Sequence, residues 1–173
     1  MVNYSETYGD LGKIDWSLSG DFNSTQVKKV KASPPIIGQS LVGVTAVAIL
    51  EKNSPQYRIV AGALWSYDKY TVNIRESFYG RSSGLEDGDT GLFQNIVHPA
   101  AITDVEATYK LTDQIKLTVG ANNLFNTYPD EKNKALVDGY VLNNDNSAVA
   151  KYPDFSPFGI NGGYYYGRVT FTW

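Results

Sequence analysis

The sequence predicts an all-β protein, an antiparallel up-and-down sheet of the kind that forms transmembrane β-barrels. Three observations support this prediction. Polar and apolar residues alternate over several long segments, which is the period of a strand with one apolar face. These segments run for roughly 8 to 12 residues, which suits tilted membrane-spanning strands better than the strands of ordinary soluble domains. Short and long connections alternate along the chain, as they do in outer-membrane barrels.

The predicted strands follow one another along the whole chain. The first, residues 2–5, has the alternation expected at the end of a strand. Six longer strands follow, each with one apolar and one polar face, at residues 13–23, 57–67, 69–80, 103–111, 115–122 and 162–173. Glu76 is the one break in the apolar face of the strand 69–80.

The connections fix an orientation. Tight turns are expected at "GDLG" (9–12), "YDK" (67–69) and "LTDQ" (111–114), and long loops over residues 24–56, 82–101 and 123–162. If the last strand ends at the periplasm, every long loop is extracellular and every short turn is periplasmic. The apolar stretch 40–50 in the first long loop is too short to span a membrane as a helix. We expect either a short helix or strand near the barrel rim, or a hydrophobic plug under the loop.

Composition excludes several classes of function. The chain has 173 residues, no cysteine and one histidine, His98, so neither a thiolate metal site nor a histidine triad is expected. A net charge of −3 without a basic patch gives nucleic-acid binding little support. No catalytic motif, cofactor loop or metal-ligand pattern is present, and we therefore expect no enzyme activity, cofactor or metal.

One acidic segment needs separate comment. "GLEDGDTG" (84–91) places Glu86, Asp87 and Asp89 close together, and hard cations such as calcium take carboxylate oxygens. The spacing does not match an EF-hand loop, and a solvated acidic loop is expected. His98, followed by a proline, is expected on the surface of a loop.

The end of the chain carries a resemblance. "VGANNLFNTYPD" (119–130) and "SPFGINGGYYYGRVTFTW" (156–173) resemble the C-terminal end of TonB-dependent outer-membrane receptors, and "YKLTDQIKLTVGANNLF" is similar to their last hairpin. The remaining strands look like barrel strands of the same family. The resemblance implies that residues 1–173 are the C-terminal six or seven strands of a plugged barrel of about 22 strands.

The resemblance also implies a function and partners. Such receptors lie in the bacterial outer membrane and import scarce nutrients, such as ferric siderophores, with energy from TonB. The implied partners are outer-membrane lipid, the barrel assembly machinery, a ferric siderophore or similar small ligand, and TonB through an N-terminal plug. This sequence shows no plug domain, TonB box or signal peptide, so we expect a receptor fragment. With two unpaired edges, the isolated chain is expected to aggregate or oligomerise.

Two sets of residues are candidate sites. The first set consists of Arg75, Tyr79, Tyr164, Tyr166 and Arg168. We expect these side chains to face the lumen and to contact an anionic or aromatic substrate, because Arg supplies a planar donor fork and Tyr a flat amphipathic surface. The alternative is that these residues pair with carboxylates of the plug or of the lumen wall. The second set is the outer face of the last strand, which the resemblance makes an insertion signal: Tyr165, Val169, Phe171 and Trp173. Alternatively, these residues only face lipid.

Two other architectures remain open. A self-contained outer-membrane barrel of about eight strands would act structurally or in adhesion. A soluble β-sandwich could bind carbohydrate, but it would place long loops at both ends. The asymmetry of the loops argues against the sandwich. Self-contained barrels use an even number of strands and close on themselves, so a count of six strands and a partial seventh favours the receptor.

Overall fold

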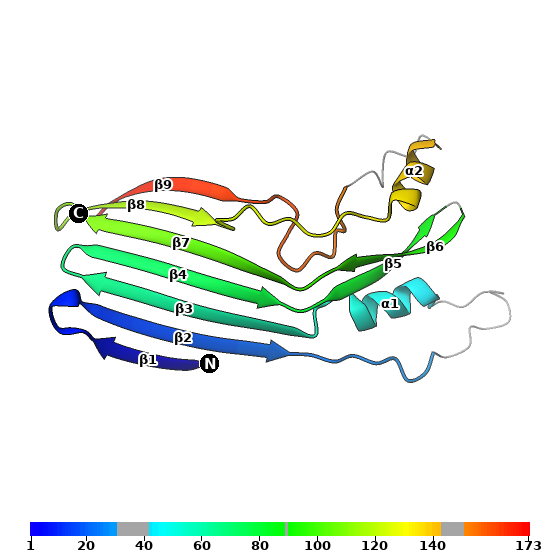
Figure 1. Ribbon diagram of the computed structural model, residues 1–173, viewed down its shortest axis with the longest axis horizontal. Helices are drawn as coiled ribbons and strands as arrows, with labels where there is room; N and C mark the ends of the chain where they lie inside the picture. The colour runs from blue at the N-terminus through cyan, green and yellow to red at the C-terminus, as the bar shows by residue number, and fades with distance from the viewer. Residues whose placement is uncertain (31–41, 89, 143–150) are drawn as a thin grey trace.

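The computed structural model describes residues 1–30, 42–88, 90–142 and 151–173. Its main element is a seven-stranded antiparallel sheet with the order β1-β2-β3-β4-β7-β8-β9 (Figure 1). The strands are β1 (Val2–Thr7), β2 (Lys13–Phe22), β3 (Tyr57–Tyr67), β4 (Tyr70–Tyr79), β7 (Ala100–Lys110), β8 (Ile115–Asn122) and β9 (Tyr164–Phe171). All seven predicted strands are therefore present, and the all-β prediction is confirmed.

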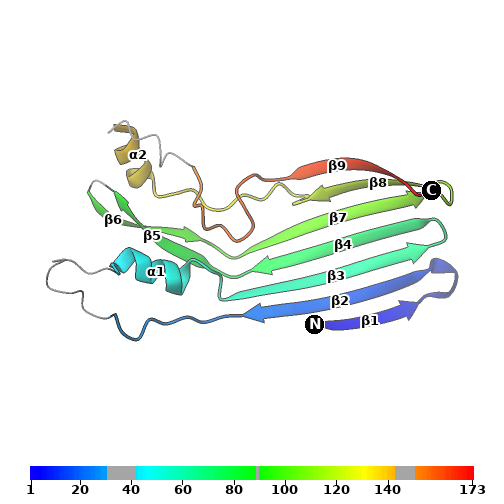
Figure 2. The same cartoon turned by 180° about the vertical axis from the view of Figure 1, so that it is seen from behind.

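Apart from the short 3-10 helix η1 (Gly9–Leu11) in the turn between β1 and β2, the other described elements gather at one end of this sheet. They are two strands that form a hairpin, β5 (Ser82–Gly88) and β6 (Gly91–Val97), and two helices, α1 (Val44–Lys52) and α2 (Lys134–Leu142). We call these four elements and residues 151–158 together the cap. Figures 1 and 2 show the cap beyond the strand ends, while the three tight turns lie at the opposite end with the C-terminus. The predicted separation of long and short connections is confirmed.

The strand register sorts the side chains onto two faces. Neighbours in register include Leu18 with Ala61 and Ile74 with Val105, and these belong to the apolar face. Asn73 pairs with Glu106, and Thr118 with Arg168, on the polar face. Since side chains alternate along each strand, every strand keeps one apolar and one polar face, as predicted.

The apolar face has no cover. Trp16, Leu18, Ile74, Val119 and Val169 are among its exposed side chains, and no described helix or second sheet lies over the strands (Figure 2). Instead, the most deeply buried side chains belong to the cap, where Val97 and Leu136 are at most 1% exposed. Soluble proteins rarely leave an apolar surface of this extent in water. A β-sandwich needs a second sheet against this face, so that alternative is inconsistent with the described residues.

The sheet is open. Its edges are β1 and β9, which do not pair with each other. The structure therefore supports an antiparallel sheet of barrel type, while closure and the number of strands in a complete barrel stay predictions.

The prediction that residues 82–101 form a loop was wrong. This segment contains the hairpin β5–β6, and β7 begins already at Ala100. Gly84 and Gly88 of β5 are positions of close packing. A Cβ on Gly84 would lie 2.7 Å from the Phe155 ring, and one on Gly88 would lie 2.8 Å from Leu136. Glycine inside a strand often marks such an approach.

The expectation that Glu86 lies in a solvated acidic loop was also wrong. The Glu86 carboxylate accepts from Nζ of Lys132 at 2.6 Å and from Nδ2 of Asn95, and the Lys132 side chain is only 5% exposed. Asp89 lies outside the described residues. The sequence could not indicate this pairing, because Lys132 lies 46 residues further along the chain.

Two helices occupy the long connections. The apolar stretch 40–50 contributes α1, which packs against β5 at the end of the sheet; Ser40 and Leu41 lie outside the described residues. The expectation of a short helix near the rim is thus supported for residues 44–50. The second helix, α2, was missed within the loop predicted at 123–162. Among the described residues, neither helix is long and apolar enough to cross a membrane.

Candidate functional site: a charged cluster on the polar face

Five residues from three strands form a charged cluster on the polar face of the sheet. We call it the polar-face cluster, and it consists of Arg75 of β4, Asp104 and Glu106 of β7, and Tyr166 and Arg168 of β9. Three of the five predicted lumen residues therefore lie together. The cluster borders a shallow hollow of about 170 Å³ that Asn73 and Asn122 also line.

Glycine in the intervening strand brings Tyr166 to Glu106. Glu106 pairs with Gly120, and Gly120 pairs with Tyr166, so the three residues form one row across β7, β8 and β9. The Tyr166 hydroxyl donates to Oε2 of Glu106 at 2.7 Å. A Cβ on Gly120 would lie 2.4 Å from Cζ of Tyr166. The ring crosses β8 only because this position has no side chain.

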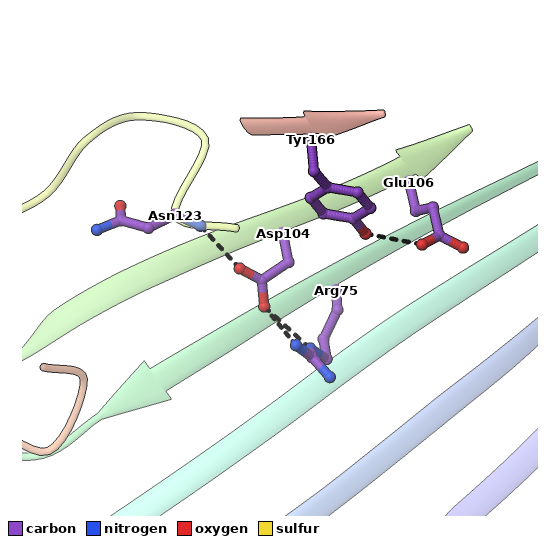
Figure 3. Close-up of polar contacts among 5 residues, drawn as sticks. All are labelled: Arg75, Asp104, Glu106, Asn123 and Tyr166. Atoms are coloured by element: carbon purple, nitrogen blue, oxygen red, sulfur yellow. Dashed lines mark hydrogen bonds and ion pairs between the residues drawn. The ribbon is translucent and has the colours of Figure 1, made fainter. Parts of the chain in front are cut away.

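Arg168 and Arg75 each have a carboxylate partner. Nη2 of Arg168 donates to the same Oε2 of Glu106 at 3.0 Å. Nε and Nη2 of Arg75 donate to Oδ2 of Asp104 at 3.1 and 2.6 Å (Figure 3). Both guanidinium side chains are 55% exposed. Solvent screens such pairs, so each contributes at most about 1 kcal/mol.

The "NNLFN" motif is attached to this cluster. The backbone N–H of Asn123 donates to Oδ1 of Asp104 at 2.8 Å, as Figure 3 shows, and the Asn123 amide closes a turn by bonding both the N–H and the C=O of Thr127. Asn126 accepts from the Gly163 N–H at 2.8 Å. Asn123 and Asn126 have φ of 52° and 55°, a left-handed conformation that asparagine tolerates better than most residues. The motif thus joins the long connection to β7 and to the start of β9.

The two remaining candidates for the lumen, Tyr164 and Tyr79, lie at the margins of the polar-face cluster. Tyr164 stacks beside Tyr166 with ring centroids 5.9 Å apart and stays exposed. Tyr79 lies at the cap end of β4, where its ring contacts Phe158 and the Arg58 guanidinium. Tyr79 therefore belongs to the polar face, but its ring contacts Arg58 of β3 and Phe158 of the cap instead of the cluster.

The four residues predicted as an insertion signal share the apolar face. Tyr165, Val169 and Phe171 are 53–71% exposed, and Trp173 is 97% exposed. The last strand ends at Phe171, two residues earlier than predicted, although the Thr172 N–H still bonds to Gln114 C=O. Lipid contact and a role as an insertion signal are both compatible with this placement, and both stay predictions.

Asp104 and Glu106 were missed as individual site residues. The strand pattern placed both on the polar face, and lumen carboxylates were one alternative for pairing the arginines. The geometry now identifies these two carboxylates as the partners of Arg75 and Arg168. Sequence spacing could not indicate this, because the Arg168–Glu106 pair spans 62 residues.

Other expectations concern sites outside the cluster. His98 is exposed, as predicted, and its backbone N–H donates to Asp130 at 2.7 Å. No group of three or more potential metal ligands gathers among the described residues. Titratable groups in the cluster serve as hydrogen-bond and ion-pair partners of one another, and this arrangement can bind and orient polar ligands.

Comparison with known proteins supports the fold. No protein-family model matches the chain, and no curated protein matches it either. Among solved structures, the chain is similar to a point mutant of the ferric enterobactin receptor PfeA from Pseudomonas aeruginosa. The match has 17% identity and a TM-score of 0.50, and it covers 99% of this chain and 21% of the receptor.

At this identity the likeness shows the fold alone. The chain spans about a fifth of the receptor that it resembles, and a receptor-barrel-like sheet is what the two share. The chain's own activity, partners and location are the subject of the following proposal.

Proposed function

We propose that this chain forms part of the barrel wall of a TonB-dependent receptor in the bacterial outer membrane, and that the receptor imports a ferric siderophore or a similar scarce nutrient. The observation that carries the proposal is the exposed apolar face of a sheet whose other face is polar and charged. In a transmembrane barrel the apolar face contacts lipid, and the polar face lines the lumen.

Aromatic side chains lie at both ends of this apolar face. Near the tight turns they are Trp65, Tyr67, Tyr70, Tyr109 and Phe171, and near the cap they are Phe22, Tyr57, Phe78 and Tyr165. Such belts flank the apolar band of outer-membrane barrels, which is about 25 Å tall.

The length of β3 fits this band. Tyr57 and Tyr67 mark its two ends. Ten residue steps of about 3.3 Å give about 33 Å along the strand, and a tilt of about 40° reduces this to about 25 Å along the membrane normal. Trp173 lies at the end of the tight turns, which would place it at the periplasmic interface, where Trp is favoured.

The polar-face cluster supports the substrate class. Arg75 and Arg168 expose about half of their side chains, and Tyr164 and Tyr166 add stacked rings beside them. A ferric catecholate is anionic and aromatic, so guanidinium and phenol groups suit it. A ligand would compete with Asp104 and Glu106 for the two arginines. TonB would act through a plug domain, and the assembly machinery through the last strand.

Iron uptake in the parent bacterium tests this proposal. Cells starved of iron and lacking this gene should lose uptake of radiolabelled iron from one class of siderophore, and the wild-type gene should restore it. The double variant Arg75→Ala/Arg168→Ala should restore less uptake than Lys116→Ala, which changes a basic residue on the same face near the turns. Unchanged uptake of every ferric siderophore, together with weaker adhesion or envelope integrity, would instead favour the structural barrel.

A further inference from the structure

The apolar face has a groove between β1, β2 and β4 that the proposed transport function does not use. Its floor is the small-residue stretch Ala61, Gly62 and Ala63 of β3, and Trp16, Leu18 and Ile74 form its sides. Its volume is about 450 Å³. Small residues in one strand between larger residues in its neighbours leave a channel that an extended alkyl chain can enter.

One lining residue of this groove is charged. Glu76 pairs in register with Ala61 and shares the apolar face with Ile74 and Phe78. Oε2 of Glu76 accepts a hydrogen bond from the Thr103 hydroxyl of β7 at 2.6 Å. A carboxylate in apolar surroundings is costly unless a cation or several donors accompany it.

The described part of the apolar face provides no cation for Glu76. By strand register, the residues facing the same side on all seven strands are aliphatic, aromatic or small, apart from Thr103, Glu6 and Glu76 itself. Every lysine and arginine of these strands belongs to the polar face. A cationic partner for Glu76 therefore has to come from outside the described apolar face, and a bound molecule can supply one.

The depth of Glu76 suits a lipid head group. Glu76 lies two residues before Phe78, which belongs to the aromatic belt near the cap. This separation is about 7 Å along the strand and about 5 Å along the membrane normal at a tilt of about 40°. At this depth, the carboxylate borders the interfacial region while the groove extends into the hydrocarbon.

We propose that this groove binds a membrane lipid with a primary ammonium head group, whose ammonium pairs with Glu76 and whose alkyl chain lies over Ala61 and Ala63. A primary ammonium donates N–H bonds to a carboxylate, and such charge-assisted bonds are stronger than neutral ones. A choline head group has no N–H to donate, and an anionic head group is repelled. The site rests on the membrane placement proposed above.

A second groove on the same face provides a control. It has a volume of about 540 Å³, and Trp65, Tyr70 and Tyr109 are among its lining residues. No carboxylate lines it. Trp16 and Trp65 therefore report on two apolar grooves that differ in the presence of an acidic residue.

Quenching of tryptophan fluorescence by brominated lipids tests the proposal. The full chain is reconstituted in phosphatidylcholine vesicles as the oligomer expected from its open edges. Two single-tryptophan proteins are used: Trp65→Phe/Trp173→Phe keeps Trp16, and Trp16→Phe/Trp173→Phe keeps Trp65. Each receives a small fraction of brominated-chain lipid with either an ethanolamine or a choline head group. Trp16 should prefer the ethanolamine lipid by about threefold, within the range of a solvent-accessible ion pair. Trp65 should show no preference.

Two variants separate charge from shape in the Trp16 protein. Glu76→Gln should remove the head-group preference while the general quenching by lipid remains. Ala61→Leu fills the floor of the groove and should reduce the quenching of Trp16 by both lipids.

The outcomes distinguish this proposal from the one on which it rests. Equal quenching of Trp16 by both lipids, or a preference that survives Glu76→Gln, would overturn the lipid site and leave the membrane placement intact. Quenching of Trp65 without any quenching of Trp16 would show that a second copy or another protein covers the groove. If neither tryptophan is quenched, the chain is not in the membrane, and both proposals fail.

Discussion

The Tyr166 hydroxyl reaches the Glu106 carboxylate across an intervening strand, at 2.7 Å. The residue between them in register is Gly120, and any Cβ there would collide with the tyrosine ring. Because Gly120 has no side chain, Tyr166 of β9 reaches Glu106 of β7, and Arg168 donates to the same carboxylate oxygen.

Gly120→Ala should break this connection. The Cβ displaces the Tyr166 ring, the bond to Glu106 is lost, and the free energy of unfolding in detergent micelles should fall by about 1 kcal/mol. Gly167→Ala is the matched control, because a Cβ there meets its first neighbour at 4.0 Å. In a Tyr166→Phe background, Gly120→Ala should cost less. An equal cost in both backgrounds would show that the glycine serves some other purpose.

Asn123 should contribute both its backbone conformation and its side chain. Asn123→Gly keeps access to the positive φ and removes the two amide bonds to Thr127, which should cost about 1–2 kcal/mol of unfolding free energy. Asn123→Ala should cost about 1 kcal/mol more, because alanine is strained in this conformation. The exposed neighbour Asn122→Ala is the control. Equal effects of the glycine and alanine variants would contradict the role of φ.

The Lys132–Glu86 pair should stabilise the cap far more than a surface pair of the same length. Lys132→Met removes the cation from a pair in which the lysine is 5% exposed, and breaking a buried pair costs about 3 kcal/mol. Lys134→Met removes a pair with the same 2.6 Å separation from Asp138, but that lysine is 86% exposed. It should cost less than about 0.5 kcal/mol. Hydrogen exchange of the β5–β6 amides measures the difference, and similar exchange in both variants would contradict it.

Asp130 should make the stability of the chain depend on pH. Burial would raise the pKa of its carboxyl, but hydrogen bonds from the backbone and ring of His98 outweigh this and hold the pKa below its ordinary value of 3.8. A lowered pKa in the folded state adds stability above the unfolded pKa, and this stability is lost as the pH falls through the folded pKa. With 44% of the Asp130 side chain exposed, the contribution is at most about 1 kcal/mol.

The variant Asp130→Asn isolates this contribution. It should be less stable than the wild type at neutral pH, and the difference should vanish in strong acid, where both side chains are neutral. Equilibrium unfolding at a series of pH values measures the difference. A difference that does not change with pH would show that the carboxylate charge is unimportant.

The strands of the main sheet were predictable because the alternation that indicates a strand depends only on neighbouring residues. Alternation places Trp16 and Leu18 on one face and Ser17 on the other, whatever the strand pairs with. The residues Asp68 and Asp113 mark tight turns for the same reason, since turn chemistry acts over a few residues. The cap was not predictable in this way. Gly84 and Gly88 lie in a segment expected to be a loop, but they are strand residues packed against Phe155 and Leu136, more than 45 positions away in the chain.

Local alternation therefore established which residues form the strands of the main sheet and which face each of their side chains occupies, and the lengths of the connections established which end of the sheet carries the long ones. The strand register and the packing of segments far apart in the sequence decided which side chains meet. They gave Arg75 and Arg168 their carboxylate partners, paired Lys132 with Glu86 and set Glu76 beside the groove over Ala61. The physical reason is distance along the chain: alternation is a property of neighbouring residues, whereas each of these contacts joins separate strands or connections, and only the assembled fold brings them together.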